Sequence, residues 1–498
     1  MTLKVGISGL RGTVDGTGER LTADTVVAWV QAFVGYLQSQ GCTRPLIALG
    51  HDARRSSPAL AALARGALLM AGADLLDLGL TLTPTVQHAV RRDSRIDGGL
   101  MITASHNPLI WNGLKFVDED GYFLPLSAWD AIGQRIDDAT LPAQPLDQVG
   151  HALSWGEEAW QAHQRAVLAA LPRELIRAKR YRVALDACNG GAARWVEPLR
   201  ALGCEVLLLH SEQDGFLARE AEPIPANLAA LRSLVLSSRS DVGFAADPDG
   251  DRLALVDGAG DAVSEEHTVV LAAQAVAQRG DRVVANVVTT HALEGALPGI
   301  EVIRSAVGEM NVVNAVLAHH AVLGGEGSGG IIVPPMNMAR DGLAAATLIL
   351  TLMAQRDAPL KTLVDALPRW QAVKEKLPAP ADGSGQLAAL MQRWRTAVPT
   401  VQAEGPSTLR VGDGEATVRL QWDDQQLTLV VEQPDSRFES RTPVAPLRAL
   451  LTRLRDRAEP LTIDMTDGLK LSGNGAWLSL RASNTEPIFR LMGEVAER

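Results

Sequence analysis

Residues 98–108 read Gly98-Gly99-Leu100-Met101-Ile102-Thr103-Ala104-Ser105-His106-Asn107-Pro108. The apolar run ends abruptly in turn-forming residues, as at the end of a buried strand, so we expect Ser105 on an exposed loop just past that strand. Its hydroxyl could act as a nucleophile or a phosphate carrier, if a base, a metal or a cation such as the nearby Lys115 activates it. Alternatively, these residues only make a turn.

Outward from this segment, strands alternate with helical patterns over residues 1 to about 150, which predicts right-handed crossovers and a mostly parallel sheet. An irregular region at about 110–175 is expected to be a connection plus a long helix around Glu157 to Leu171. Two further units of roughly 100 residues then repeat the scheme. Beyond about residue 370, short alternating segments predict antiparallel strands in a separate α+β domain.

Composition limits the class of protein. With 498 residues, of which 46% are hydrophobic, the chain can form three or four domains. The segment Met1 to Gly12 lacks the pattern of a signal peptide, and no apolar run is long enough to span a membrane, so we expect a cytoplasmic protein without a membrane partner. The net charge of −11 argues against a nucleic-acid partner. Cys42, Cys188 and Cys204 have neither zinc nor disulfide spacing.

Three aspartates, Asp247, Asp249 and Asp251, alternate along the chain after a predicted strand. On extended backbone they share one side, and three such charges repel one another unless a cation joins them. Carboxylate oxygens favour Mg²⁺ over zinc, and an EF-hand is excluded because Arg252 and Gly258 occupy its glycine and glutamate positions. Arg252 would lie beside the metal and could help to hold a phosphate. An Asp-rich turn is the alternative.

Two further loops suggest a phosphorylated ligand. The glycine-rich run 324–330 lacks the Lys-Ser/Thr ending of a nucleotide-binding loop, but its Glu326 and Ser328 suit sugar hydroxyls; a plain glycine turn is the alternative. A later loop gathers groups that match a phosphate dianion, namely Arg481, Ser483, Asn484, Thr485 and Arg490. A capped surface turn with a solvated arginine is the other interpretation of that loop.

Together these motifs resemble those of the α-D-phosphohexomutase superfamily, which includes phosphoglucomutase, phosphomannomutase and phosphoglucosamine mutase. The likeness runs over the whole chain, starting at Gly6-Ile7-Ser8-Gly9-Leu10-Arg11-Gly12. It implies a heart-shaped enzyme with three topologically similar mixed-sheet α/β domains and a C-terminal α+β domain. The implied boundaries are 1–152, 153–257, 258–368 and 369–498.

The resemblance also implies roles for individual residues. Ser105 would carry a phosphoryl group, and one Mg²⁺ would be held by Asp247, Asp249, Asp251 and a phosphate oxygen on Ser105. Arg11 and Lys115 would stabilise the phosphoryl oxygens or move protons, Glu326 and Ser328 would select the sugar, and the loop at 481–490 would grip the phosphate that does not react. The substrate would be a small phosphosugar, hexose 1,6-bisphosphate would be intermediate and activator, and the enzyme a monomer or homodimer.

One departure bears on the substrate. Many bacterial members of the family end the sugar loop in Ser-Gly-His, whereas this chain reads Ser328-Gly329-Gly330. Another residue, Lys115 or His106, would then handle the proton, or the loop is arranged differently. The glycine ending is more similar to members that act on mannose or glucosamine phosphates. A Mg-dependent phosphatase and a non-catalytic sugar-phosphate sensor are the alternative functions, although a sensor has no need of Ser105 and the three aspartates.

Overall fold

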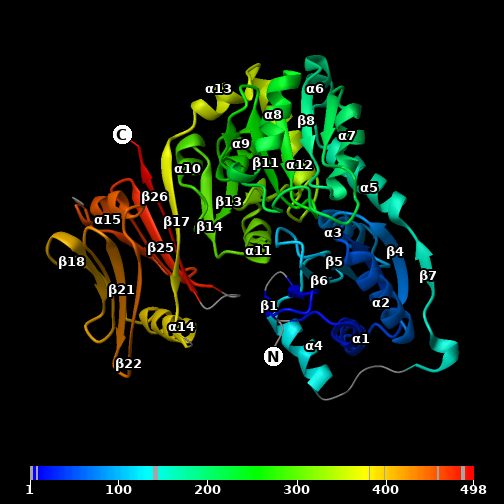
Figure 1. The fold of residues 1–498 in the computed structure, drawn as a ribbon, viewed down its shortest axis with the longest axis horizontal. Helices are drawn as coiled ribbons and strands as arrows, with labels where there is room; N and C mark the ends of the chain where they lie inside the picture. Colours follow the sequence, from blue (N-terminus) through cyan, green and yellow to red (C-terminus); the bar gives the residue numbers. More distant parts are fainter. Residues whose placement is uncertain are drawn as a thin grey trace. The chain divides into compact units, whose positions relative to one another are not determined.

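The computed structural model describes residues 4–6, 9–18, 20–137, 144–380, 382–397, 399–456, 459–483 and 488–497. The chain forms two compact units (Figure 1). Unit 1 comprises Met1–Asn286, Ala296–Ile303 and Gly308–Ala366, and unit 2 comprises Val287–Gly295, Arg304–Val307 and Leu367–Arg498. Within the described ranges, none of the helices combines the length and the hydropathy that spanning a bilayer requires. The four domain boundaries given above stay a prediction.

The first sheet of unit 1 has seven strands in the order β1-β2-β6-β5-β3-β4-β7. Their bounds are Lys4–Gly6 (β1), Gly9–Thr13 (β2), Leu46–His51 (β3), Asp74–Leu80 (β4), Gly98–Ile102 (β5), Trp111–Val117 (β6) and Ala152–Ser154 (β7). Strand β3 pairs in parallel with β4 and β5, whereas β6 is antiparallel to β5 and to β2. The sheet is therefore mixed, because the chain reverses in the hairpin that follows Ser105.

Helices cover both faces of this sheet. One face packs against α1 (Ala23–Ser39), α2 (Ser57–Met70) and α4 (Leu126–Asp137), and the other against α3 (Thr83–Arg92) and α5 (Gly156–Ala169). Phe116 of β6 stacks on Phe33 of α1 and on Trp129 of α4 in the core. The prediction of an irregular connection after residue 110 was thus wrong, because these aromatic residues make β6 and α4 core elements, whereas the helix predicted around 157–171 is confirmed as α5. A 3-10 helix (η1, Leu146–Gln148) and α6 (Arg173–Lys179) complete the region.

Two further sheets repeat the arrangement and belong to unit 1, except for Arg304 and Ser305 at the end of β14. The second has the order β12-β11-β10-β8-β9 and the third β14-β13-β15-β16. Their strands are Arg182–Asp186 (β8), Glu205–Leu209 (β9), Val242–Ala246 (β10), Leu253–Asp257 (β11), Ala262–Val263 (β12), Arg282–Asn286 (β13), Glu301–Ser305 (β14), Leu323–Gly325 (β15) and Ile331–Ile332 (β16). In the second sheet, β10 is parallel to β8 and forms an antiparallel hairpin with β11. In the third sheet, β15 is parallel to β13 and forms an antiparallel hairpin with β16, as β5 does with β6.

Helices and short 3-10 turns lie between and after the strands of these two sheets. The helices are Val196–Ala201 (α7), Ala229–Ser238 (α8), Glu266–Val276 (α9), Ala292–Ala296 (α10), Glu309–His319 (α11), Gly342–Arg356 (α12) and Leu360–Asp365 (α13), with 3-10 turns at Gly191–Trp195 (η2) and Pro225–Asn227 (η3). Asp341 caps α12, since its carboxylate accepts from the amides of Leu343 and Ala344.

Unit 2 contains two five-stranded antiparallel sheets, in the orders β17-β26-β25-β24-β23 and β18-β19-β20-β21-β22. The strands are Trp370–Pro378 (β17), Thr400–Ala403 (β18), Thr408–Gly412 (β19), Thr417–Trp422 (β20), Gln426–Gln433 (β21), Ser436–Pro443 (β22), Thr462–Asp464 (β23), Leu469–Gly473 (β24), Ala476–Ala482 (β25) and Ile488–Ala496 (β26). Helices α14 (Gly383–Trp394) and α15 (Arg448–Arg455) and a 3-10 turn (η4, Gly405–Ser407) accompany them. The predicted fold class, three mixed-sheet α/β domains and a C-terminal α+β domain, is confirmed.

Candidate active site

Three loops of unit 1 occupy the same position in their sheets. The loop of Ser105 joins β5 to β6, the loop of Asp247 to Asp251 joins β10 to β11, and the loop of Glu326 and Ser328 joins β15 to β16. We call them the serine loop, the metal loop and the sugar loop. Backbone and side-chain contacts connect the three, so one repeated topology brings these residues into a common centre.

Ser105 lies in a strained and buried loop. Its φ of 51° is in the left-handed region, which costs energy for a residue other than glycine. The Ser105 amide donates to Thr103 Oγ1 at 2.9 Å, and the Thr103 hydroxyl donates to Asp52 Oδ2 at 2.6 Å. The expectation of an exposed serine was wrong, since Ser105 is only 1% exposed and packs against the metal loop.

Arg54 binds the backbone of the serine loop, a role that was not predicted from the sequence. Its guanidinium pairs with Asp52 and donates to four backbone carbonyls, those of Ser105 at 2.6 Å, Asn107 at 2.6 Å, Pro108 at 2.8 Å and Trp111 at 3.2 Å. These bonds offset the strain at Ser105. The sequence predicts a mostly parallel sheet, in which the residues after different strands can lie at one edge. In the structure β3 and β5 are parallel neighbours, so the residues after β3 lie at the same sheet edge as the serine loop.

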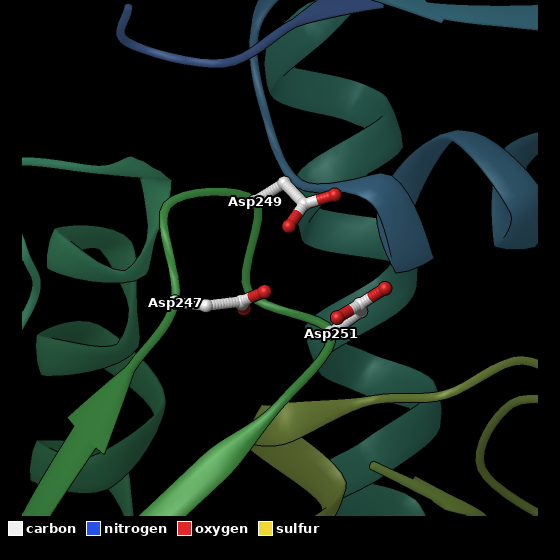
Figure 2. A group of neighbouring side chains, drawn as sticks. All are labelled: Asp247, Asp249 and Asp251. Carbon is white, nitrogen blue, oxygen red and sulfur yellow. The ribbon is translucent and has the colours of Figure 1, made fainter. Parts of the chain in front are cut away.

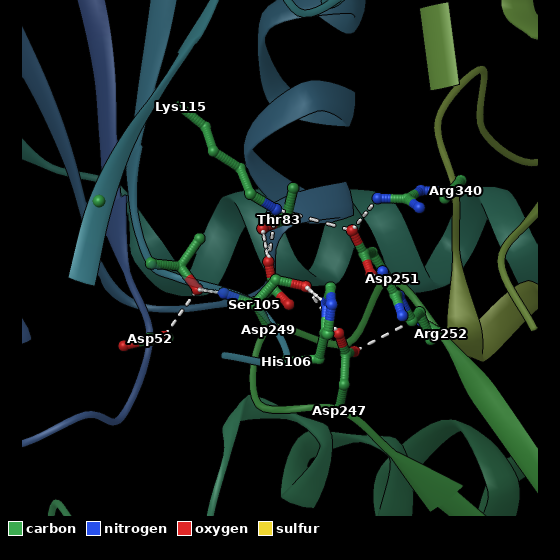
Figure 3. A network of polar contacts seen from close by, with 12 residues as sticks. Asp52, Thr83, Ser105, His106, Lys115, Asp247, Asp249, Asp251, Arg252 and Arg340 are labelled. Atoms are coloured by element: carbon green, nitrogen blue, oxygen red, sulfur yellow. Dashed lines mark hydrogen bonds and ion pairs between the residues drawn. The ribbon is translucent and has the colours of Figure 1, made fainter. Parts of the chain in front are cut away.

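The side chain of Ser105 faces the metal loop. Its Oγ donates to Asp247 Oδ2 at 3.0 Å and lies 3.4 Å from His106 Nδ1 (Figure 3). The predicted cation Arg11 approaches from β2, where its Nη1 donates to Asn107 Oδ1 at 2.6 Å. Burial lowers the pKa of Arg11 to about 10, while the nearby Asp249 acts in the opposite direction. The Ser105 hydroxyl therefore contacts a carboxylate and an imidazole, and the Arg11 guanidinium binds the same loop through Asn107.

The three aspartates of the metal loop form one buried cluster (Figure 2). One carboxylate oxygen from each lies within 4.8 Å of the other two. Asp249 Oδ2 accepts from Lys115 Nζ at 2.7 Å and from Thr83 Oγ1 at 2.6 Å, but Oδ1 of Asp249 and Oδ1 of Asp251 accept no hydrogen bond from any described residue. Buried carboxylate oxygens without donors fit a hard divalent cation such as Mg²⁺.

The pKa shifts of the three-aspartate cluster also fit a cation site. Burial raises the pKa of Asp247 well above its usual range, and the charges of Asp251 and Asp249 add to this effect. Burial also opposes ionisation of Asp249, but the charge and hydrogen bond of Lys115 outweigh it and lower the pKa of that carboxyl. A bound cation would relieve the repulsion that penalises a third negative charge here.

His106 is neutral at physiological pH. Burial and the charges of Arg252 and Arg11 lower the pKa of this imidazole well below 6.5. Arg252 donates its amide to Asp247 Oδ1 at 3.2 Å, and its guanidinium lies 3.6 Å from Glu222 and 3.8 Å from Asp251. The predicted placement of Arg252 beside the metal loop thus agrees with its position.

The sugar loop packs directly on the metal loop. Leu253, the first residue of β11, donates its amide to the Gly329 carbonyl at 3.1 Å. Gly329 has a φ of +82°, and a Cβ on it would lie 2.2 Å from the Leu253 carbonyl oxygen, so glycine is required there. Glu326 is buried and Ser328 half-buried. The glycines of this run therefore serve close packing as well as a turn.

The predicted phosphate loop lies in unit 2, at the hairpin of β25 and β26. Arg481 and Arg490 are register partners, and Arg481 Nη1 lies 3.2 Å from Asp467 Oδ2. Ser483 is buried, and its amide donates to the Ile488 carbonyl at 2.9 Å. Asn484 and Thr485 lie outside the described residues, as do Ile7 and Ser8 of the first motif.

Two further residues of the centre were not predicted from sequence. Thr83 at the start of α3 binds Asp249 through both its hydroxyl and its amide, the latter to the Asp249 carbonyl at 3.0 Å. Arg340, just before α12, reaches Asp251 at 2.7 Å. Arg340 precedes the capping residue of a predicted helix, which is the one local signal that could have drawn attention to it.

Comparisons with known proteins agree with this architecture. Family models described as phosphoglucomutase/phosphomannomutase α/β/α domains I, II and III match residues 2–142, 161–260 and 264–370. The phosphoglucosamine mutase of Frankia alni is 35% identical over 392 residues, which cover 75% of this chain and 83% of that protein. A phosphoglucomutase/phosphomannomutase of Thermococcus kodakarensis is 27% identical over 497 residues, covering 98% and 94%.

A solved structure shares the fold. The phosphoglucomutase/phosphomannomutase family protein of Burkholderia thailandensis superposes with a TM-score of 0.75 at 22% identity, covering 99% of this chain and 93% of that one. The parafusin of Paramecium, a phosphoglucomutase, gives a TM-score of 0.66 at 16% identity, covering 99% and 90%.

Proposed function

Since the chain belongs to the phosphoglucomutase and phosphomannomutase family of phosphohexomutases, which are isomerases, we propose that it interconverts hexose 6-phosphate and hexose 1-phosphate through a phosphoserine and a hexose 1,6-bisphosphate. The observation that carries this proposal is the Ser105 hydroxyl, 3.0 Å from an aspartate of a buried metal-type triad. A serine next to a cation site and a guanidinium suits phosphoryl transfer better than acyl transfer, which needs a His-Asp relay.

The reaction has two transfers. Phosphorylated Ser105 gives its phosphoryl group to the free hydroxyl of the sugar phosphate: the Oγ–P bond breaks, a sugar O–P bond forms, the sugar hydroxyl loses its proton to a base, and Ser105 Oγ takes one up. The bisphosphate then turns over and returns its other phosphoryl group to Ser105 Oγ, which loses its proton, while the released sugar oxygen gains one. We assign proton transfer to His106, whose Nδ1 lies 3.4 Å from Ser105 Oγ.

The residues around Ser105 would share the remaining work. Mg²⁺ held by Asp247, Asp249 and Asp251, with a phosphate oxygen on Ser105, would offset charge on the transferring group. Lys115 and Arg11 would stabilise its other oxygens, and Arg252 would help to orient the phosphate.

Substrate recognition would involve the other two loops. Glu326 and Ser328 would accept and donate to sugar hydroxyls, and the loop in unit 2 would hold the second phosphate. Its binding groups would be Arg481, Ser483, Asn484, Thr485 and Arg490. This phosphate-binding loop must bind the phosphate at either end of the sugar, because the two phosphates exchange places during the cycle. Water must also be excluded, since hydrolysis of the phosphoserine would turn the enzyme into a slow phosphatase.

We propose glucosamine phosphate as the preferred substrate, with mannose and glucose phosphates next. The name of the relative from Frankia alni, phosphoglucosamine mutase, supports glucosamine phosphate, and that of the relative from Thermococcus kodakarensis, phosphoglucomutase/phosphomannomutase, supports the other two sugars. The decisive experiment measures isomerisation of the 1- and 6-phosphates of the three sugars with Mg²⁺ and catalytic amounts of the matching bisphosphate. Comparable release of free phosphate would favour the phosphatase alternative.

Ser105→Ala tests the mechanism itself. The variant should lose isomerisation by at least roughly 10³-fold, because no other group can carry the phosphoryl, while sugar-phosphate binding measured by calorimetry stays within a few-fold of wild type. Ser56→Ala is a suitable control, since Ser56 is a hydroxyl of the same unit that contacts the Asn112 amide and none of the reacting groups. Full activity in Ser105→Ala would defeat the phosphoserine mechanism.

A further inference from the structure

Arg340 joins three carboxylates that come from three separate elements. Its Nη2 lies 2.7 Å from Asp251 Oδ2 in the metal loop, and its Nη1 lies 3.0 Å from Glu326 Oε2 in the sugar loop. The third contact is from Nε to Glu309 Oε2, at 2.9 Å, at the start of α11. Every nitrogen of the guanidinium is therefore committed to a carboxylate, and the side chain is buried.

Each of the last two carboxylates is also held from its other side. Glu326 Oε1 accepts from Asn286 Nδ2 and from the Gly308 amide, both at 3.0 Å. Glu309 Oε1 accepts from Gln87 Nε2 at 2.9 Å. Arg340 thus connects groups that have little freedom of their own, and its rigid planar fork sets the distance between them.

Gly330 lies directly against this arginine. A Cβ at position 330 would lie 2.5 Å from Arg340 Cδ and 3.2 Å from its Cγ, with the Asp251 carbonyl oxygen at 3.3 Å. The backbone of Gly330 is not in the left-handed region, so an alanine could adopt its conformation. Glycine is required here because of the space that Arg340 fills, whereas the neighbouring Gly329 is required by its backbone as well.

We propose that Arg340 is a positioning residue that fixes the sugar loop to the metal loop, and that Gly330 supplies the space it needs. The inference rests on the proposed function, since it assigns a role in placing the sugar relative to the metal. Arg340 is not a catalytic residue in this scheme, because its three nitrogens already bind protein carboxylates. It acts through Asp251 and Glu326, which would touch the metal and the sugar.

A double-mutant cycle tests the mutual requirement, with Gly330→Ala, Arg340→Ala and the double variant. Each is measured for kcat/KM and for the Mg²⁺ dissociation constant without substrate, by calorimetry. We expect Gly330→Ala alone to lower kcat/KM at least tenfold and to weaken Mg²⁺ at least threefold, because the displaced guanidinium moves Asp251. In the Arg340→Ala background the same change should alter either quantity less than twofold.

The control is Gly66→Ala, on a helix position where an added Cβ meets no atom within 4 Å. It should leave both quantities unchanged. Full-sized effects of Gly330→Ala in the Arg340→Ala background would overturn the proposal. Arg340→Lys gives an independent test that does not depend on Gly330: one ammonium cannot span three carboxylates, so kcat/KM should fall at least tenfold and Mg²⁺ should bind at least threefold more weakly, both measured at a temperature at which the variant is fully folded. Wild-type kinetics in that variant would also overturn the proposal.

The two proposals can fail separately. Absence of mutase activity in the wild-type enzyme would refute the proposed function, and the Mg²⁺ arm of the cycle would still decide the role of Arg340. If the wild-type enzyme has mutase activity but the effects of Gly330→Ala and Arg340→Ala are additive in the double variant, only the role of Arg340 is refuted.

Discussion

Two buried lysines, one in each unit, show how differently a hidden positive charge can be accommodated. Lys115 in unit 1 is 1% exposed, and its Nζ lies 2.7 Å from Asp249 and 3.6 Å from Asp251. Lys470 in unit 2 is 4% exposed, and its Nζ donates to the Val287 carbonyl at 2.5 Å and to His291 Nε2 at 2.9 Å. It also lies 4.5 Å above the ring of Trp477.

The partners decide what each lysine can do. The carboxylates of Asp249 and Asp251 pair with the Lys115 ammonium, in the centre to which we assign phosphoryl transfer. Among the described residues, the hydrogen-bond partners of Lys470 are neutral, and burial, helped by the charge of Arg304, lowers its pKa to about 8, although nearby carboxylates act in the opposite direction. The pKa of its neighbour His291 falls to about 2, chiefly because of burial, so that imidazole is neutral and can accept from the ammonium. We infer that Lys115 serves the chemistry and Lys470 serves the packing of unit 2.

Of the two lysine substitutions, Lys115→Met should have the larger effect on turnover. Loss of a buried cation beside the transferring phosphoryl group should lower kcat by roughly 10²–10³-fold. The same change removes repulsion of the metal, so Mg²⁺ should bind several-fold more tightly, as measured by calorimetry. Lys361→Met is the matched control, because Lys361 pairs with Asp261 and Asp365 at the surface of the same unit and should leave both values unchanged. Weaker Mg²⁺ binding in Lys115→Met would contradict this role.

Addition of Mg²⁺ should stabilise the strands around the metal loop in unit 1 and leave unit 2 unaffected. At 100 times its dissociation constant, an ion that binds only the folded state stabilises it by about 2.7 kcal/mol. Amide hydrogen exchange should therefore slow in β10 and β11, which flank the metal loop, and stay unchanged in β24 and β25. Asp251→Asn should remove most of the protection. Equal slowing in both units would show that the ion does not belong to the aspartate cluster of unit 1.

Lys470→Met should have the smallest effect on turnover, within about threefold of wild type, because Lys470 is not among the residues to which we assign catalysis or substrate binding. Its effect should appear in stability against pH. The folded-state pKa of about 8 lies below the unfolded value of 10.5, so the unfolded chain binds the extra proton between these values.

Wild-type stability should thus rise with pH in this window, by at most about 1.4 kcal/mol per pH unit, and the increment is lost as the pH falls to 8. The variant should lack this slope when unfolding is followed by denaturant titration at several pH values. An identical pH dependence in both proteins would exclude Lys470 as its source.

Much of the fold could be predicted from the sequence. The alternation of strands and helices, and the change to antiparallel strands after about residue 370, follow from hydrophobic periodicity, which is a local property. The errors occurred where that signal is weak. The strand β6 and helix α4 were missed because Trp111–Val117 and Leu126–Asp137 follow proline and glycine turns that suggested an irregular region.

The sequence by itself determined which chemistry is available. Alternating Asp247, Asp249 and Asp251 predict a cation site because their spacing alone forces three charges together, and Ser105 follows a strand end that can be read from composition. Only the tertiary structure decided how these groups work together. Lys115 meets Asp249 across 134 residues, Arg340 meets Asp251 across 89, and Arg54 binds the Ser105 carbonyl across 51. Such contacts depend on how sheets and helices pack, and sequence periodicity contains no information about partners so far apart.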